Sequence, residues 1–283
     1  MIFVSSSCIK NKFIKSSVEE LAVNGFKNIE LSGGTEYYEN FEYDLLELKD
    51  KYNLNYRCHN YFPPPQKHFV LNLASLNEDA FNSSFNHLKN VISLSKRLGS
   101  TKFGFHAGFF IDIRVSEIGK KISRDKLFNK KKSIQRFCDA FEKLNNLEES
   151  VTLFIENNVF SITNAKTYKG ENPFMMTGFK EYKTLKEKIN FNLLLDVAHL
   201  KVSTNSLNLN WESELKNMIN VSSYIHISDN DSFHDLNNTL TKNSNFLSIL
   251  GQNDNTNKDF TLEIYDGMDS IKRSHDILHD VVT

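Results

Sequence analysis

The sequence predicts an α/β protein that forms a single (β/α)8 TIM barrel over residues 1–283. Short apolar runs typical of buried strands occur eight times, and stretches with helical periodicity lie between them. Strands of a parallel barrel are buried on both faces, which explains why they read as apolar runs. With 283 residues, of which 40% are hydrophobic, the chain can bury one large core of this kind or two smaller ones.

The strand predictions depend on runs rich in β-branched, aromatic and leucine residues. The clearest is NLLLDVAH at 192–199, where three leucines precede an acid. Consecutive parallel strands need a crossover connection, which is usually a helix. In chain order, the predicted strands are 2–7, 27–34, 55–62, 102–109, 151–158, 192–199, 223–231 and 260–266.

Three of the intervening stretches carry a clear helical pattern. Residues 76–99 have acids in the first predicted turn, apolar residues three and four apart, and Gly99 at the end. The same periodicity recurs at 131–147 and at 211–219. Strand and helix signals therefore alternate along the chain.

A doubly wound open sheet is the competing α/β fold. That fold carries a Gly-rich phosphate loop after its first strand, and the sequence has none there. The one long irregular connection, 159–178, has a length that is typical of segments covering a site. The barrel is therefore the preferred fold.

Charge and cysteine content restrict the partners and the compartment. Because 34 Lys and Arg residues balance 35 Asp and Glu residues, net charge does not draw the chain to nucleic acid or to an anionic membrane. Cys8, Cys58 and Cys138 are too widely spaced for a disulfide framework or a CxxC site, which suits a reducing compartment. The sequence shows neither a signal-peptide core nor a run of membrane-spanning length. We therefore expect a cytoplasmic protein with no membrane partner.

Ionisable residues recur at the ends of the predicted strands. In TIM barrels the carboxyl ends of the strands carry the active site. One such residue would mean little, but their recurrence predicts a functional site at this mouth. They are His59, His106, Glu156, Asp196, His199, His226, Asp229, Asp231 and Glu263.

Each of these residues also has an ordinary structural interpretation. A single strand histidine is more often a hydrogen-bonded core residue than a ligand, and an acid at a strand end often caps a turn or helix. His68, His87, His275 and His279 lie elsewhere and are expected on the solvated surface, and His234 is undecided. The structural interpretation is weak for the whole set, because several buried carboxylates would repel one another.

A divalent cation would remove that repulsion. Glu156, Asp196, His226 and Glu263 offer oxygen and nitrogen ligands. Such a set suits Mn, Mg, Co or Zn better than copper or an iron-sulfur cluster. The sequence therefore predicts a divalent metal ion as cofactor.

The same strand ends resemble those of a known family. IENN, LLLDVAHLK, YIHISDND and LEIY are similar to the metal-binding strand ends of the xylose isomerase-like TIM-barrel superfamily, particularly its sugar phosphate isomerase/epimerase branch. CHNYFPPP and FHAGF resemble the histidine motifs of the third and fourth strands in several branches, and endonuclease IV is related. The resemblance extends from NIELSGG to LEIYD and so covers most of the chain.

This resemblance implies one catalytic metal with four ligands, Glu156, Asp196, His226 and Glu263. His199 would touch the substrate or a further metal. The same mouth also serves dehydratases and endonuclease IV-like hydrolases. Relatives read approximately DxH where this chain has Asp235, Leu236 and Asn237, and an amide is a poorer zinc ligand than an imidazole, which argues against a third metal position.

Sugar isomerisation fits these residues chemically, because it needs a metal to polarise a hydroxycarbonyl and a base to take a C–H proton. The favoured hypothesis is a metal-dependent sugar or sugar-phosphate isomerase/epimerase. Glu156 and Glu263 would exchange protons on opposite faces of a cis-enediolate. His199, His59 and His106 would contact the substrate, and Lys201 would reach an anionic group such as a phosphate, unless it is an ordinary solvated lysine.

Two other classes of function stay open. His59, His106 and Glu156 could hold a second metal in an endonuclease IV-like phosphodiesterase, although the balanced charge argues against nucleic acid as the partner. A sugar-binding barrel without catalysis is the other class, and the presence of both glutamates disfavours it. One metal is favoured over two or three, and a homodimer is an open alternative.

Overall fold

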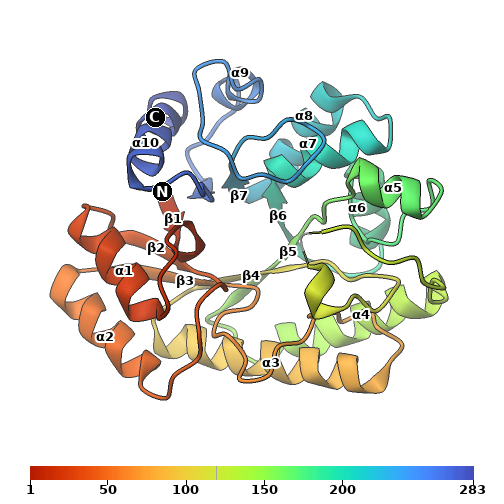
Figure 1. Cartoon of the computed structure of the whole chain (residues 1–283), viewed down its shortest axis with the longest axis horizontal. Coiled ribbons are helices and arrows are strands. Elements are labelled where there is room, and N and C mark those ends of the chain that lie inside the picture. Colours follow the sequence, from red (N-terminus) through yellow and green to blue (C-terminus); the bar gives the residue numbers. More distant parts are fainter. Residues whose placement is uncertain (119) are drawn as a thin grey trace.

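The computed structural model describes residues 1–118 and 120–283. Eight parallel strands of these residues close into a barrel, in which each strand pairs with its neighbour in sequence and the last pairs with the first. The predicted TIM barrel is confirmed, and Figure 1 shows helices around the strands. The strands are β1 (Ile2–Ser5), β2 (Asn28–Leu31), β3 (Asn55–His59), β4 (Lys102–His106), β5 (Thr152–Glu156), β6 (Asn192–Asp196), β7 (Ser222–Ile227) and β8 (Asp259–Leu262).

The three helices predicted from periodicity are confirmed, with shifts only at their ends. They are α3, α4 and α8 in the following list, and the C-terminal helix α10 lies beside β1 and β8. The helices are α1 (Ile14–Val23), α2 (Phe41–Tyr52), α3 (Glu78–Arg97), α4 (Lys130–Asn145), α5 (Ile162–Thr167), α6 (Phe179–Lys186), α7 (Val197–Ser206), α8 (Trp211–Val221), α9 (Leu247–Gly251) and α10 (Met268–Val282), with 3-10 turns η1 (Ser6–Cys8) and η2 (Val115–Glu117).

Helix α3 shows how local sequence defines these elements. The Asn77 side chain accepts hydrogen bonds from two amides of the first turn and so caps the helix. Lys96 and Arg97 stand in the last turn, where positive charge interacts favourably with the helix dipole. Leu88 and Ile92 are buried against the rest of the core. The helix therefore presents one apolar face to the barrel, as its periodicity predicts.

The connection after β5 contains more order than predicted. The expectation of an irregular segment over 159–178 was wrong for helix α5, which begins where the Ser161 side chain accepts a hydrogen bond from the Asn164 amide. Near the end of the 159–178 connection, Phe174 forms an antiparallel bridge to Phe109 in the loop after β4. This segment is therefore attached to a second loop beyond the strand ends.

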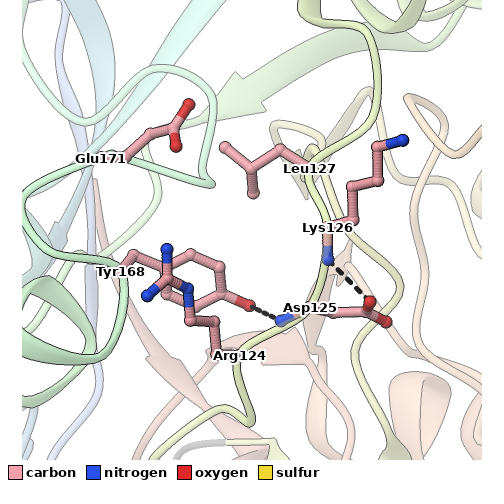
Figure 2. A pocket seen from close by; sticks show the side chains of 6 residues that line it. All are labelled: Arg124, Asp125, Lys126, Leu127, Tyr168 and Glu171. Carbon is pink, nitrogen blue, oxygen red and sulfur yellow. Dashed lines mark hydrogen bonds between the residues drawn. The ribbon is translucent and has the colours of Figure 1, made fainter.

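The same connection lines a surface cavity of about 600 Å³ (Figure 2). Tyr168 closes one side, and its hydroxyl accepts a hydrogen bond from the Asp125 amide at 3.2 Å. None of the strand-end residues lines this cavity. Its lining residues are Arg124, Asp125, Lys126, Leu127, Tyr168 and Glu171.

An ion-pair cluster fills the N-terminal end of the barrel. Asp259 of β8 is hydrogen-bonded to Arg57, to Lys102 Nζ at 2.7 Å and to the N-terminal ammonium at 3.1 Å. The Arg57 guanidinium lies 3.9 Å from the ring centroid of Phe3 and 4.8 Å from that of Tyr224. The strand-end residues occupy the opposite end of the barrel.

Two further properties concern the whole described chain. No helix among residues 1–118 and 120–283 is both long and apolar enough to cross a membrane. Cys8, Cys58 and Cys138 are buried and free. Burial raises the pKa of Cys58 to about 12, which leaves the thiol protonated at neutral pH.

Candidate active site

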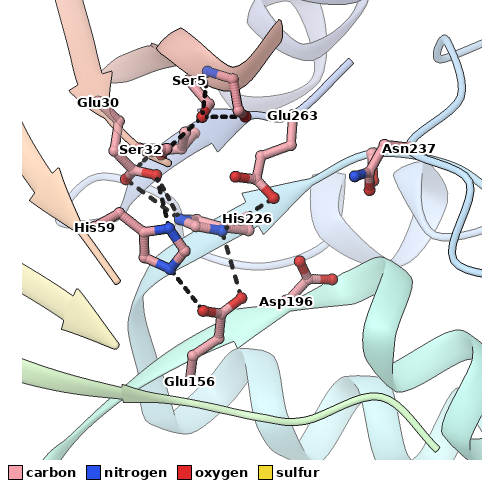
Figure 3. Close-up of polar contacts among 12 residues, drawn as sticks. Ser5, Glu30, Ser32, His59, Glu156, Asp196, His226, Asn237 and Glu263 are labelled. Atoms are coloured by element: carbon pink, nitrogen blue, oxygen red, sulfur yellow. Dashed lines mark hydrogen bonds and ion pairs between the residues drawn. The ribbon is translucent and has the colours of Figure 1, made fainter. Parts of the chain in front are cut away.

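Strand register brings the strand-end residues into one layer of the barrel interior. His106 pairs with Glu156 across β4 and β5, and Asp196 pairs with His226 across β6 and β7. Glu263 follows β8 directly, and its Oε2 lies 3.6 Å from His226 Nδ1. These side chains converge at the carboxyl end of the barrel, as expected, and Figure 3 shows most of them.

Glu156 lies at the centre of this cluster and is completely buried. Its Oε2 is hydrogen-bonded to His59 Nε2 at 2.7 Å and lies 3.2 Å from His106 Nδ1. Its Oε1 lies 3.6 Å from His226 Nδ1 and 3.7 Å from His199 Nδ1. Burial alone would raise the pKa of the Glu156 carboxyl, but the surrounding imidazoles, above all His106, hold it well below its usual value.

Three buried atoms of the cluster have no hydrogen-bond partner, namely His106 Nδ1 and the facing pair Glu156 Oε1 and His226 Nδ1. The 3.6 Å between the two atoms of this pair is long for a hydrogen bond. It is close to the separation of about 3.4 Å between two ligands that each lie about 2.1 Å from one tetrahedral ion. Ligand atoms of Asp196, His226 and Glu263 also lie within 4.8 Å of one another. The residues present therefore fit a divalent cation.

Asp196 uses its two oxygens differently. Oδ1 caps helix α7 by accepting a hydrogen bond from the His199 amide at 2.7 Å. Oδ2 makes no such cap and lies 3.8 Å from Nε2 of the His199 ring, which belongs to the same cluster. Burial raises the pKa of Asp196 to about 7, against the opposing effect of the His199 charge. The helix-cap interpretation of Asp196 is therefore confirmed, and its role as a metal ligand stays a prediction.

His199 is held between backbone and acids. Its Nδ1 is hydrogen-bonded to the carbonyl oxygen of Asn157 at 2.9 Å, and its Nε2 lies 3.2 Å from Asp235 Oδ2. Burial alone would lower the pKa of His199, but the carboxylates of Asp196 and Asp235 raise it well above its usual value. The neighbouring acids therefore favour the protonated form of His199.

Lys201 does not point into solvent. Its Nζ donates hydrogen bonds to Asp229 Oδ1 at 2.6 Å and to the carbonyl oxygen of Asn230 at 2.8 Å, and only 11% of its side chain is exposed. The solvated-lysine interpretation is therefore wrong, while the role in binding an anionic group stays a prediction. Asp231 lies in the loop beyond and pairs with the exposed His234 at 2.9 Å.

The histidines expected on the surface divide into two groups. His68 and His279 are exposed, as expected. His87 and His275 are half-buried, so the expectation was wrong for them. Their rings pack edge-on against aromatic residues, His87 against Phe69 at 5.7 Å between centroids. An imidazole on a helix can serve as such a packing surface, which its sequence position does not show.

Two neighbours of the cluster were not identified as candidates from the sequence. Glu30 of β2 is completely buried, and its Oε1 lies 3.1 Å from His226 Nε2. An acid between Ile29 and Leu31 was the available signal, because a buried carboxylate requires a partner. Asp235 is the other neighbour. The sequence analysis names it only as part of the segment that departs from the DxH pattern of relatives. Asn237 is buried, and its Oδ1 accepts a hydrogen bond from Ser228 Oγ at 3.0 Å.

The sequence matches a family model described as xylose isomerase-like TIM barrel over residues 18–280. The chain belongs to this family. The resemblance expected from the strand-end motifs is therefore confirmed. A comparison with curated proteins gives no match.

Solved structures of low sequence identity share the fold of this family over nearly the whole chain. A D-tagatose 3-epimerase-like protein is 18% identical, with a TM-score of 0.74 over 99% of this chain and 96% of that chain. D-psicose 3-epimerase from Clostridium cellulolyticum is 12% identical, with a TM-score of 0.70 over 99% of both chains. Endonuclease IV from Thermus thermophilus is 14% identical, with a TM-score of 0.63 over 99% of this chain and 97% of that chain. Sugar epimerases and an endonuclease IV thus share this fold, so the fold alone does not select the reaction.

Proposed function

We propose that this protein is a divalent-metal-dependent isomerase or epimerase that acts on a small sugar or sugar phosphate. The observation that supports it best is the placement of two carboxylates, from Glu156 and Glu263, each 3.6 Å from the same nitrogen, His226 Nδ1. Two carboxylates on either side of one cation site could take and return the proton that isomerisation or epimerisation moves. The similarity of the fold to sugar 3-epimerases is consistent with this reaction.

Four residues would hold the ion, with His226 supplying nitrogen and three acids supplying oxygen. When bound, the ion would polarise the carbonyl and the adjacent hydroxyl of the sugar. Mn, Mg, Co and Zn all accept such a ligand set. The ligands would be Glu156, Asp196, His226 and Glu263.

The two glutamates differ in their surroundings. Burial alone would raise the pKa of Glu263, but the His226 charge lowers it to about 2, so the carboxylate is ionised at neutral pH. Oε2 of Glu156 contacts His59 and His106, so a proton taken up there could pass to an imidazole. In this proposal the two acids take and return a proton on opposite faces of an enediolate, and His199 orients a hydroxyl group of the substrate.

The variants Glu156→Gln and Glu263→Gln test this scheme. Each keeps the side-chain shape and one oxygen but removes the base, so turnover on a panel of ketoses, aldoses and their phosphates should fall by about 100- to 10,000-fold. The matched control is Glu142→Gln, since Glu142 is exposed on helix α4. Undiminished turnover in both variants, measured with the cation bound, would reject the two-base scheme.

A metal-dependent phosphodiesterase is the second candidate, and one observation favours it. Ligand atoms of His106, Glu156 and His199 lie within 4.8 Å of one another, and Asp235 lies 3.2 Å from His199. These residues could hold a further ion beside the first, as hydrolysis of a phosphodiester often requires. Elemental analysis and an assay on an abasic DNA duplex separate the candidates. Cleavage of the duplex by protein that holds more than one ion would replace the isomerase proposal.

A further inference from the structure

Glu30 contacts His226 at the ring nitrogen that faces away from the candidate ligands. Its Oε1 and Oε2 lie 3.1 and 3.2 Å from His226 Nε2. The other ring nitrogen, Nδ1, lies 3.6 Å from Glu156 Oε1 and 3.6 Å from Glu263 Oε2. The two nitrogens of one imidazole therefore face two different environments, and Figure 3 shows both sides of the ring.

The Glu30 carboxylate is itself fixed in place. Its Oε2 accepts a hydrogen bond from Thr261 Oγ1 at 2.9 Å, and both residues are completely buried. Thr261 lies beside His226 because the two residues pair across β7 and β8. A carboxylate that is held by a neighbouring strand can define the orientation of the imidazole beside it.

We infer that Glu30 is a positioning residue that keeps a proton on His226 Nε2 and so leaves the lone pair of Nδ1 facing Glu156 and Glu263. The inference rests on the proposed function, in which His226 is a metal ligand. A metal-binding histidine commonly donates its second N–H to a carboxylate, which fixes the tautomer and the ring orientation. Loss of such a partner typically lowers metal affinity by about 10- to 100-fold.

A direct ligand role for Glu30 is the alternative. Ligand atoms of Glu30, His59 and Glu263 lie within 4.8 Å of one another. The contacts favour positioning, because Glu30 Oε2 is hydrogen-bonded to His226 Nε2 and to Thr261 Oγ1. Glu30 Oε1 has no hydrogen-bond partner, and it lies 3.1 Å from the same His226 nitrogen but 3.9 Å from His59 Nδ1. If Glu30 held an ion of its own with His59 and Glu263, loss of its carboxylate would reduce the number of ions bound. If Glu30 positions His226, the same loss would reduce only the affinity of the protein for the cation.

The affinity test compares wild-type protein with Glu30→Gln, Thr261→Val and the exposed control Glu142→Gln. Zn²⁺ and Co²⁺ dissociation constants are measured by competition with a chromophoric chelator. Glu30→Gln should bind about tenfold more weakly at unchanged stoichiometry, because an amide oxygen is a weaker acceptor than a carboxylate. Thr261→Val should cause a smaller loss, and the control should cause none. Equal affinities for wild type and Glu30→Gln would overturn the inference.

A second readout does not depend on how the variants fold. In wild-type protein loaded with Zn²⁺, imidazole ¹⁵N–¹H correlation spectra should show His226 protonated at Nε2 and unprotonated at Nδ1. The opposite assignment would overturn the positioning role while leaving the proposed metal-dependent reaction intact. If wild-type protein binds neither cation, the proposed function fails and the inference fails with it.

Discussion

Replacement of Asp259 by Asn should destabilise the barrel by about 2 kcal/mol near neutral pH. The Asp259 carboxylate accepts hydrogen bonds from Arg57 and Lys102 at the N-terminal end of the barrel. Burial alone would raise its pKa, but the neighbouring cations, above all Arg57, lower it from 3.8 to about 2. This difference between the unfolded-state and folded-state pKa of Asp259 corresponds to about 2 kcal/mol of folding free energy while the carboxylate is ionised.

Complete removal of one partner from a fully buried ion pair costs more, roughly 3–5 kcal/mol. The lower figure is expected here because only part of the cluster is buried. The side chain of Arg57 is 5% exposed, but that of Lys102 is 24% exposed and the N-terminal residue is 63% exposed. Solvent therefore screens part of the charge that the substitution leaves without a partner.

The pH dependence gives this prediction its sharpest test. Because the folded-state pKa of Asp259 lies below the unfolded value, its stabilising effect is present above about pH 4 and is lost as the pH falls through about 2. Urea unfolding followed by circular dichroism should compare wild type, Asp259→Asn and the exposed control Asp50→Asn. The difference between wild type and Asp259→Asn should shrink as the pH is lowered from about 7 to about 3. A cost that stays constant with pH, or that the control shares, would refute the electrostatic explanation.

Two further predictions concern packing and thiol chemistry. Gly108→Ala should reduce the free energy of unfolding by about 1–3 kcal/mol, because the new methyl group would collide with the Ala74 side chain, and urea unfolding would measure the loss. Stability equal to that of wild type would show that the backbone of the loop after β4 shifts enough to accommodate the methyl group. Burial raises the pKa of Cys58 to about 12 and that of Cys138 to about 11, so an aromatic disulfide reagent at mildly alkaline pH should react with native protein far more slowly than with unfolded protein. Rapid reaction of the native protein would contradict the described burial.

The strands could be predicted because their surroundings are uniform. Strands buried on both faces need apolar residues at nearly every position, and this pattern is visible without knowledge of the fold. The strand ends were less certain, because the apolar run at 102–109 continues past His106 into the loop. Helix α5 was missed because a helix of six residues is too short to show a period clearly.

The candidate site could be predicted because barrel topology brings the strand ends together. Once eight strands were placed, Glu156, His226 and Glu263 had to meet at one mouth. Glu30 carried only a weak signal, since it stands within an apolar run rather than after it. The partners of Lys201 could not be predicted, because Asp229 and Asn230 belong to an irregular loop whose path is set by tertiary contacts.

Proton transfer at a sugar carbon is the central claim, and solvent deuterium reports it directly. Wild-type protein with Mn²⁺ or Co²⁺ would be incubated with the sugar panel in D2O and the sugars followed by NMR. We predict that deuterium enters at the carbon next to the carbonyl as an isomer or epimer accumulates. Absence of deuterium from every sugar, with the cation bound and with cleavage of an abasic duplex under the same conditions, would contradict the isomerase proposal.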